Sequence, residues 1–147
     1  MASYVWTTTV DCGDPYRLSV WWSEVLDYAE NPEYPNHPED EECLIRSPAA
    51  PERSGREAGP ERSGREAGHQ ILFIRVPESK SVKNRVHFDL RPADRSRDEE
   101  VTRLVAHGAT VVDDLRKPDG KGWVVLADPE GNEFCVLRGE AEIAASA

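Results

Sequence analysis

One histidine of this chain stands in a pattern that could do chemistry. His87 lies in the segment Asn84–Leu90 (NRVHFDL), where apolar Val86 and Phe88 alternate with polar residues, as in a half-buried strand. An imidazole titrates close to neutral pH, so a histidine on the polar face of a strand can hydrogen-bond a ligand or accept a proton. We therefore expect His87 to face a binding pocket, whereas His37, His69 and His107 lie among prolines, in a loop and at a helix end, where we expect solvated side chains.

Cys135 is a candidate nucleophile, and Trp123 is a candidate wall of the same pocket. A reactive thiol needs a nearby base, which His87 could supply if both side chains face one cavity. Cys135 is flanked by Phe134 and Val136, however, and a strand cysteine in that setting is more often a small packed residue. We favour packing for Cys135. The alternation around Trp123 leaves open whether this ring lines the pocket or fills the core.

The composition excludes several classes of protein. The net charge of −10 over 147 residues argues against a nucleic-acid partner, which requires a positive surface. Three cysteines without CxxC spacing are not a disulfide framework, which favours a reducing compartment. The N-terminus lacks a signal-peptide pattern, and no apolar run approaches the roughly 20 residues of a membrane helix. We expect a cytoplasmic protein with no membrane partner.

The first half predicts a strand, a helix and two further strands. Residues 4–12 are rich in β-branched and aromatic residues, which is typical of a strand, and Asp14-Pro15 is a helix start followed by an apolar stripe at helical spacing. Residues 30–42 are acidic and rich in proline, so they give only a weak indication of an edge strand. Strands follow at residues 43–45 and 70–76.

A tandem duplication separates those last two strands. The nine letters PERSGREAG occupy residues 51–59 and recur at residues 60–68. Solenoid repeats are longer and carry an apolar face, which this sequence lacks. Its Pro, Gly, Ser, Arg and Glu content predicts a disordered loop over residues 48–69, to which we assign no chemistry.

The second half predicts the same order of elements. After the Asn84–Leu90 strand, Ser96 and Glu99 form a capping-box signature for a helix that ends near Gly108. Strands are expected at residues 110–112, 123–127 and 133–137, and the tail beyond Arg138 is expected to fray. The order strand, helix and three strands would occur twice if residues 30–42 contain a strand.

Landmark residues also align the two halves. Thr7 precedes Asp14 by seven positions, and His87 precedes Asp94 by the same distance. If each aspartate begins a helix, Thr7 and His87 occupy equivalent strand positions. We therefore predict one α+β domain of two βαβββ modules, at about residues 3–77 and 83–138.

Two motifs resemble a known family. The segment NRVHFDL, followed by WVVLADPEGNEFCVL at residues 123–137, is similar to the glyoxalase-like (bleomycin-resistance-like) domains found in many actinobacterial proteins. These domains belong to the vicinal oxygen chelate superfamily. The resemblance covers the chain except for the duplicated loop and the tail. It implies that two curled sheets form a cleft, and it allows a homodimer, although two modules in one chain can also close a cleft alone.

The resemblance implies a metal site that this sequence fills only in part. Metal-dependent members offer a donor, often histidine, from each first strand and a glutamate four positions after the turn glycine. His87 matches one donor, whereas Thr7 stands where the other would be, and a hydroxyl is a weak ligand for a transition metal. Cys135 stands four positions after Gly131, and Glu133 shares its strand face. The implied metal ligands are therefore His87 with Glu133 or Cys135.

We predict a small-molecule binding protein with no metal cofactor, because the donor set is incomplete. The alternative is a lyase, isomerase or dioxygenase with an unusual divalent metal site or none. Neither reading identifies a catalytic residue. The residues expected to line the cleft are Thr7, His87, Trp123, Glu133 and Cys135.

Overall fold

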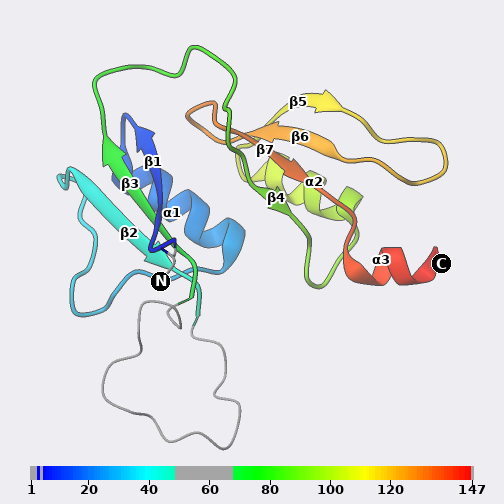
Figure 1. Cartoon of the computed structure of the whole chain (residues 1–147), viewed down its shortest axis with the longest axis horizontal. Helices are drawn as coiled ribbons and strands as arrows, with labels where there is room; N and C mark the ends of the chain where they lie inside the picture. Colours follow the sequence, from blue (N-terminus) through cyan, green and yellow to red (C-terminus); the bar gives the residue numbers. More distant parts are fainter. Residues whose placement is uncertain (1–2, 4, 49–67, 147) are drawn as a thin grey trace, which may run out of the picture. The chain divides into compact units, whose positions relative to one another are not determined.

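A computed structural model describes residues 3, 5–48 and 68–146 of the chain. The chain divides into two compact units, Met1–Ser79 and Lys80–Ala147, called unit 1 and unit 2 below (Figure 1). The duplicated loop lies outside the described residues, apart from its end at Gly68. No helix in the described part of the chain is long and apolar enough to cross a membrane.

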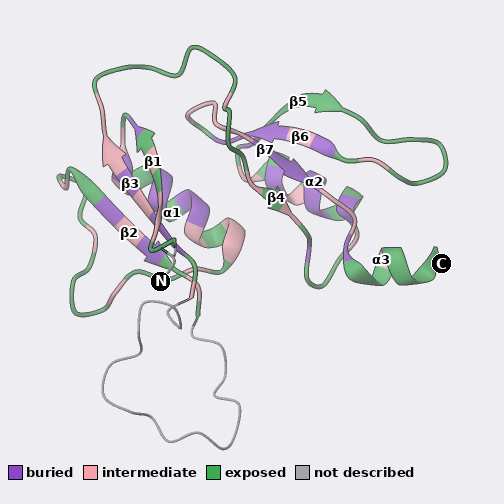
Figure 2. Cartoon of the chain, viewed as in Figure 1, coloured by how far each residue is buried: buried purple, intermediate pink, exposed green. Residues whose placement is uncertain are grey.

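Unit 1 is a three-stranded sheet with a helix packed against it. It contains β1 (Thr8–Cys12), α1 (Pro15–Leu26), β2 (Glu42–Arg46) and β3 (Gln70–Arg75). The strand order is β1-β3-β2, with β1 parallel and β2 antiparallel to β3. The predicted helix start is confirmed, because the Asp14 carboxylate accepts the Arg17 N–H at 3.0 Å and Pro15 follows it. Leu18, Trp21 and Trp22 of α1 are buried (Figure 2).

The strand suggested within residues 30–42 is absent. Between α1 and β2, the described residues make only isolated bridges, Ala29 with Arg46 and Asn31 with Tyr34. The side chain of Asn36 instead serves the free edge of β2, donating to the Leu44 carbonyl at 3.1 Å and accepting the Leu44 N–H at 3.0 Å. One amide side chain thus does what a neighbouring strand would do, in a segment whose prolines cannot donate backbone hydrogen bonds.

Unit 2 is a four-stranded sheet with two helices. It contains β4 (Asp89–Leu90), α2 (Arg97–Ala106), β5 (Thr110–Asp114), β6 (Val124–Ala127), β7 (Glu133–Val136) and α3 (Glu140–Ala145). The strand order is β4-β7-β6-β5, with β4 parallel to β7 and the other neighbours antiparallel. Its core includes Leu104, Val124, Leu126, Phe134 and Val136, which are at most 1% exposed (Figure 2).

The capping box of α2 is confirmed. Glu99 N–H donates to the Ser96 hydroxyl at 3.2 Å, and Ser96 N–H donates to the Glu99 carboxylate at 2.8 Å. Asp94 therefore does not begin this helix, contrary to the landmark alignment. Its carboxylate pairs with Arg95 at 2.9 Å instead. The local signal of Ser96 with Glu99 satisfies two free N–H groups and outweighs the isolated aspartate.

The first strand of unit 2 is shorter than its sequence pattern predicts. Only Asp89 and Leu90 pair with β7, and Val86 is 80% exposed. The expectation that Val86 lies on a half-buried strand face is wrong. Alternation shows which residues could share a face, but the neighbouring strand decides how many of them pair. His87 consequently lies just before β4.

The C-terminal segment forms a helix that extends to Ala145, although we expected it to fray. Helix α3 is capped by Glu142, whose carboxylate accepts the Gly139 N–H at 2.8 Å. The same carboxylate accepts the Arg97 N–H at 2.7 Å, at the first position of α2. One side chain thus satisfies free N–H groups of two helices.

Candidate metal-binding site in unit 2

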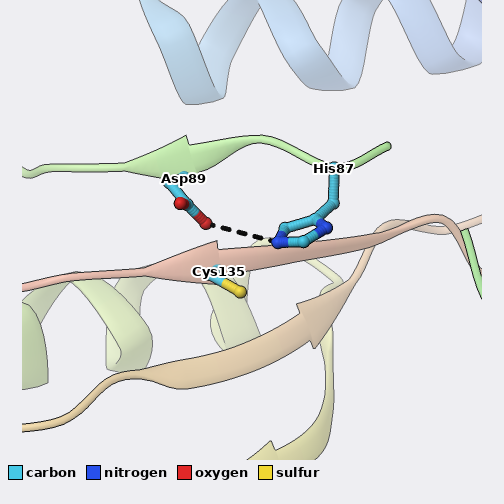
Figure 3. Close-up of side chains that lie close together, drawn as sticks. All are labelled: His87, Asp89 and Cys135. Carbon is cyan, nitrogen blue, oxygen red and sulfur yellow. Dashed lines mark ion pairs between the residues drawn. The ribbon is translucent and has the colours of Figure 1, made fainter. Parts of the chain in front are cut away.

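Three side chains of unit 2 bring different donor atoms together: His87, Asp89 and Cys135 (Figure 3). Pairing of β4 with β7 places Asp89 opposite Cys135, and His87 lies two residues before Asp89. Their donor atoms all lie within 4.8 Å of one another, and His87 Nε2 is 3.6 Å from Asp89 Oδ1. Among the residues that the structure describes, this is the one such cluster of three or more His, Cys, Asp or Glu side chains.

The three donors differ in their access to solvent. Cys135 is 7% exposed, whereas the side chains of His87 and Asp89 are 37% and 56% exposed. The thiol therefore lies at the bottom of the cluster, and the imidazole and carboxylate lie nearer to solvent. The exposed groups that a ligand would meet first are therefore His87 and Asp89.

The environment of Cys135 keeps its thiol protonated. Burial raises the pKa of Cys135 to about 11, and the negative charge of Asp89 and a hydrogen bond to it act in the same direction. A nucleophilic cysteine needs a lowered pKa so that the thiolate is present near neutral pH. This environment agrees with the expectation that Cys135 is not a nucleophile.

Glu133 belongs to the same strand but is engaged elsewhere. Its carboxylate accepts the Asn84 N–H at 3.0 Å and pairs with Lys80 Nζ at 3.0 Å. It is not a member of the three-donor cluster. Of the two alternatives that we considered beside His87, the structure thus brings Cys135, rather than Glu133, into the cluster.

The other two predicted cleft residues lie apart from the cluster in the chain. Trp123 directly precedes β6 and is 40% exposed. Thr7 belongs to unit 1, where its hydroxyl donates to the Gln70 carbonyl at 3.3 Å. Their part in ligand binding stays a prediction.

Asp89 is the residue that the sequence reasoning overlooked. A signal was available, because Asp89 follows His87 by two positions and the alternating pattern puts both on the polar face. The resemblance implied donors at other positions, so Asp89 was not among the predicted ligands. Pairing with Cys135 in the neighbouring strand gives this carboxylate its place.

His69 of unit 1 is exposed, as we expected, but its imidazole also has two hydrogen-bond partners. Its Nε2 lies 3.0 Å from Thr8 Oγ1, and its Nδ1 lies 3.1 Å from Tyr28 Oη. Burial lowers the pKa of this imidazole and raises the pKa of the Tyr28 phenol. His69 therefore links the start of β1 to the segment after α1, a structural role.

The cluster fits a transition-metal ion better than a hard cation. Mg²⁺ and Ca²⁺ prefer oxygen ligands, whereas imidazole and thiolate suit Zn²⁺ and its neighbours. A tetrahedral zinc site spaces its N, O and S donors about 3.3–3.6 Å apart. The distance from His87 Nε2 to Asp89 Oδ1 already meets that spacing. The distances from these two groups to the Cys135 sulfur are at most 4.8 Å, so they would have to shorten only slightly when an ion binds. Three protein ligands with an open position are typical of catalytic zinc sites.

Comparison with known proteins agrees with this fold. The glyoxalase-like domain family matches residues 7–137. No curated protein sequence matches the chain. A mutant of the fosfomycin resistance protein FosX from Listeria monocytogenes, complexed with Mn(II) and 1S,2S-dihydroxypropylphosphonic acid, is 16% identical with a TM-score of 0.63, covering 97% of this chain and 94% of its own.

Two further solved structures share the fold. FosX from Mesorhizobium loti is 14% identical with a TM-score of 0.60, covering 99% of each chain. Glyoxalase I from Leishmania major is 15% identical with a TM-score of 0.54, covering 99% of this chain and 93% of its own. The predicted α+β class is confirmed, with two sheets as in this group of proteins. The chain belongs to the glyoxalase-like domain family of the vicinal oxygen chelate superfamily.

Proposed function

We propose that the protein binds an oxygen-bearing small molecule at the cluster of His87, Asp89 and Cys135, through a divalent transition-metal ion held by these three side chains. The observation that carries this proposal is the approach of three different donor atoms to within 4.8 Å of one another. Our expectation of a metal-free protein rested on a shortage of donors. Asp89 removes that shortage within unit 2.

A bound ion with an open position would polarise the oxygens of a ligand and act as a Lewis acid. The residues of this chain would have distinct parts. His87 must be neutral to offer Nε2, and Cys135 must lose its proton on binding, so the ion competes with protons for both. Asp89 supplies the negative charge that offsets part of the charge of the ion. This arrangement supports activity as a lyase, isomerase or dioxygenase.

A second candidate is direct binding of a small molecule without a metal. It is favoured by the state of the cluster itself, where Asp89 lies 3.6 Å from His87 Nε2 and the pKa of Cys135 is about 11. Here His87 would hydrogen-bond the ligand, and Asp89 would orient the imidazole. Thr7 and Trp123 stay predicted contributors to ligand binding.

Metal binding separates the two candidates. Zn²⁺ and Co²⁺ are titrated into the purified, chelator-treated protein by calorimetry, and the metal content of protein isolated without chelator is measured by elemental analysis. We expect one ion per chain, and much weaker binding of that ion in His87→Ala, Asp89→Ala and Cys135→Ser. Asp113→Ala is the matched control, because this exposed carboxylate lies on β5.

Failure to bind either ion under replete conditions would rule out the metal-dependent form. A thermal-shift screen with small molecules would then test the second candidate, since a specific ligand raises the melting temperature by mass action. Equal loss of metal in Asp113→Ala would show nonspecific binding by the acidic surface.

A further inference from the structure

His87 is held from two sides although it lies outside the strand ladder. On its C-terminal side, the Phe88 carbonyl accepts the Cys135 N–H at 2.9 Å. On its N-terminal side, the Asn84 N–H donates to the Glu133 carboxylate at 3.0 Å. Both anchors come from β7, the strand that also carries Cys135. The imidazole thus lies on a short segment fixed at each end to the strand of its partner.

The anchor at Glu133 is the stronger candidate for control of His87. Its side chain is only 13% exposed and binds Lys80 Nζ as well as the backbone of Asn84. Lys80 in turn donates to the Val82 carbonyl. The Glu133 carboxylate therefore contacts the segment before His87 at two residues, Lys80 and Asn84. A hydrogen bond to an ionised and largely buried acceptor is stronger than one between neutral groups.

Apolar packing contributes little to holding the segment before His87. Val82 and Val86 are 75% and 80% exposed, so apolar packing does not fix the chain before His87. Pairing with β7 begins only at Asp89. The loss of the Glu133 contact would remove the hydrogen bond that joins the chain before His87 to β7.

We infer that Glu133 is a positioning residue, which sets the metal affinity of the cluster by holding His87 beside Asp89 and Cys135. The inference rests on the proposed function, and it assigns Glu133 a role different from the ligand role that the sequence suggested. Both of its carboxylate oxygens are engaged, Oε1 at 3.2 Å and Oε2 at 3.0 Å from Lys80 Nζ. Its effect on the metal would therefore pass through His87.

The test uses Co²⁺ alone as the probe, because its absorption spectrum reports the donor set as well as the affinity. Removal of partners that orient metal ligands typically weakens metal binding by about 10- to 100-fold. We expect that loss in Glu133→Ala, with a changed Co²⁺ spectrum. Glu133→Gln keeps an acceptor for the Asn84 N–H, so it should lose less. Glu78→Ala, an exposed glutamate just before unit 2, is the matched control and should bind Co²⁺ as the wild type does.

A double-mutant cycle tells positioning from a general loss of structure. If Glu133 acts through His87, Glu133→Ala should weaken Co²⁺ binding strongly in the wild type and hardly at all in His87→Ala. Equal effects in the two backgrounds would overturn the inference, as would wild-type affinity in a folded Glu133→Ala protein. If Glu133→Ala does not fold, Lys80→Met and Glu133→Gln provide the same comparison.

A second readout separates failure of this inference from failure of the proposed function. NMR signals of the His87 ring and their contacts to Cys135 are compared between wild type and Glu133→Ala without metal. A protein that binds no Co²⁺ contradicts the metal site. Unchanged His87 signals contradict the positioning role, whether or not the metal binds.

Discussion

The two units pair their first and last strands in the same way, but they carry different side chains at the corresponding positions. Each pairs its first strand in parallel with its last strand, β1 with β3 in unit 1 and β4 with β7 in unit 2. The two ladders can be aligned at their last residue pairs. In that alignment, His87 corresponds to Thr9, Asp89 to Asp11, and Cys135 to Ile74. Unit 1 keeps the carboxylate but lacks the imidazole and the thiol.

This alignment differs from the one based on landmark residues, which matched Thr7 to His87. That alignment assumed that Asp94 begins a helix, but α2 begins after Ser96. The connection between β4 and α2 is longer than the one between β1 and α1, so distance from the helix misplaces the strand positions. Strand register is the better guide because hydrogen bonds fix it.

The difference shows which positions the fold leaves free to vary. In unit 1, Thr9 and Asp11 are exposed. In unit 2, His87 and Asp89 are exposed as well, and only Cys135 is buried. Residues at the two exposed positions can change without disturbing the core. One unit can therefore carry metal-binding side chains there, while the other keeps the same strand pairing without them.

The largest expected loss of stability concerns a feature that both units share, a buried phenylalanine in the last strand. Phe73 in β3 and Phe134 in β7 are 0% and 1% exposed. Replacing either with alanine removes a buried ring and leaves a cavity, so the free energy of unfolding should fall by about 3–5 kcal/mol in each case. Urea denaturation followed by circular dichroism measures it. Val112→Ala, at an exposed site of β5, should change stability little, and a small loss for one phenylalanine would show that its unit packs more loosely.

The next largest effect concerns metal affinity, which depends on donor atoms that only unit 2 is proposed to supply. His87→Ala should weaken Zn²⁺ binding by at least about 100-fold, since even outer partners of metal ligands change affinity by about 10- to 100-fold. Thr9→Ala, the corresponding change in unit 1, should leave the affinity unchanged. Calorimetric titration measures both. If Thr9→Ala also weakens binding, the donor set is not confined to unit 2.

The buried thiols predict a loss of stability at high pH. The pKa of Cys135 is raised to about 11, mainly by burial, so the unfolded chain releases this proton at lower pH than the folded chain. The stabilising contribution is present below pH about 9 and disappears as pH rises towards 11. We expect the wild type to lose more unfolding free energy over this range than Cys135→Ser.

Thiol reactivity gives an independent check of the same environment. Burial also raises the pKa of Cys43 in unit 1. Both thiols should react slowly with a disulfide reagent at pH 8 in the folded protein and rapidly after unfolding. Rapid reaction of Cys135 in the folded protein would contradict a protonated, buried thiol.

The smallest expected effect compares the two helix caps. Asp14 caps α1 through its own carboxylate, whereas Ser96 and Glu99 cap α2 reciprocally. Asp14→Ala and Ser96→Ala should each lower the free energy of unfolding by about 1 kcal/mol. Thermal unfolding measures both losses, with Ser81→Ala, at an exposed loop position, as a control. No loss for Ser96→Ala would mean that Glu99 alone sustains the cap.

Local features could be predicted where neighbouring residues cause them. Asp14 with Pro15 and Ser96 with Glu99 mark helix starts because their side chains satisfy N–H groups within a few residues. The proline-rich segment could not be predicted in the same way. Its order depends on Asn36, whose amide reaches the backbone of Leu44 in β2.

The sequence by itself determined the α+β class and the two helix starts, because periodicity and capping are local, and it directed attention to His87. Only the tertiary structure decided the membership of the site. It brought Asp89 beside Cys135, turned Glu133 towards Lys80 and Asn84, and placed Val86 in solvent. The physical reason is strand register: the pairing of β4 with β7 selects which distant side chains meet, and no local pattern encodes that choice.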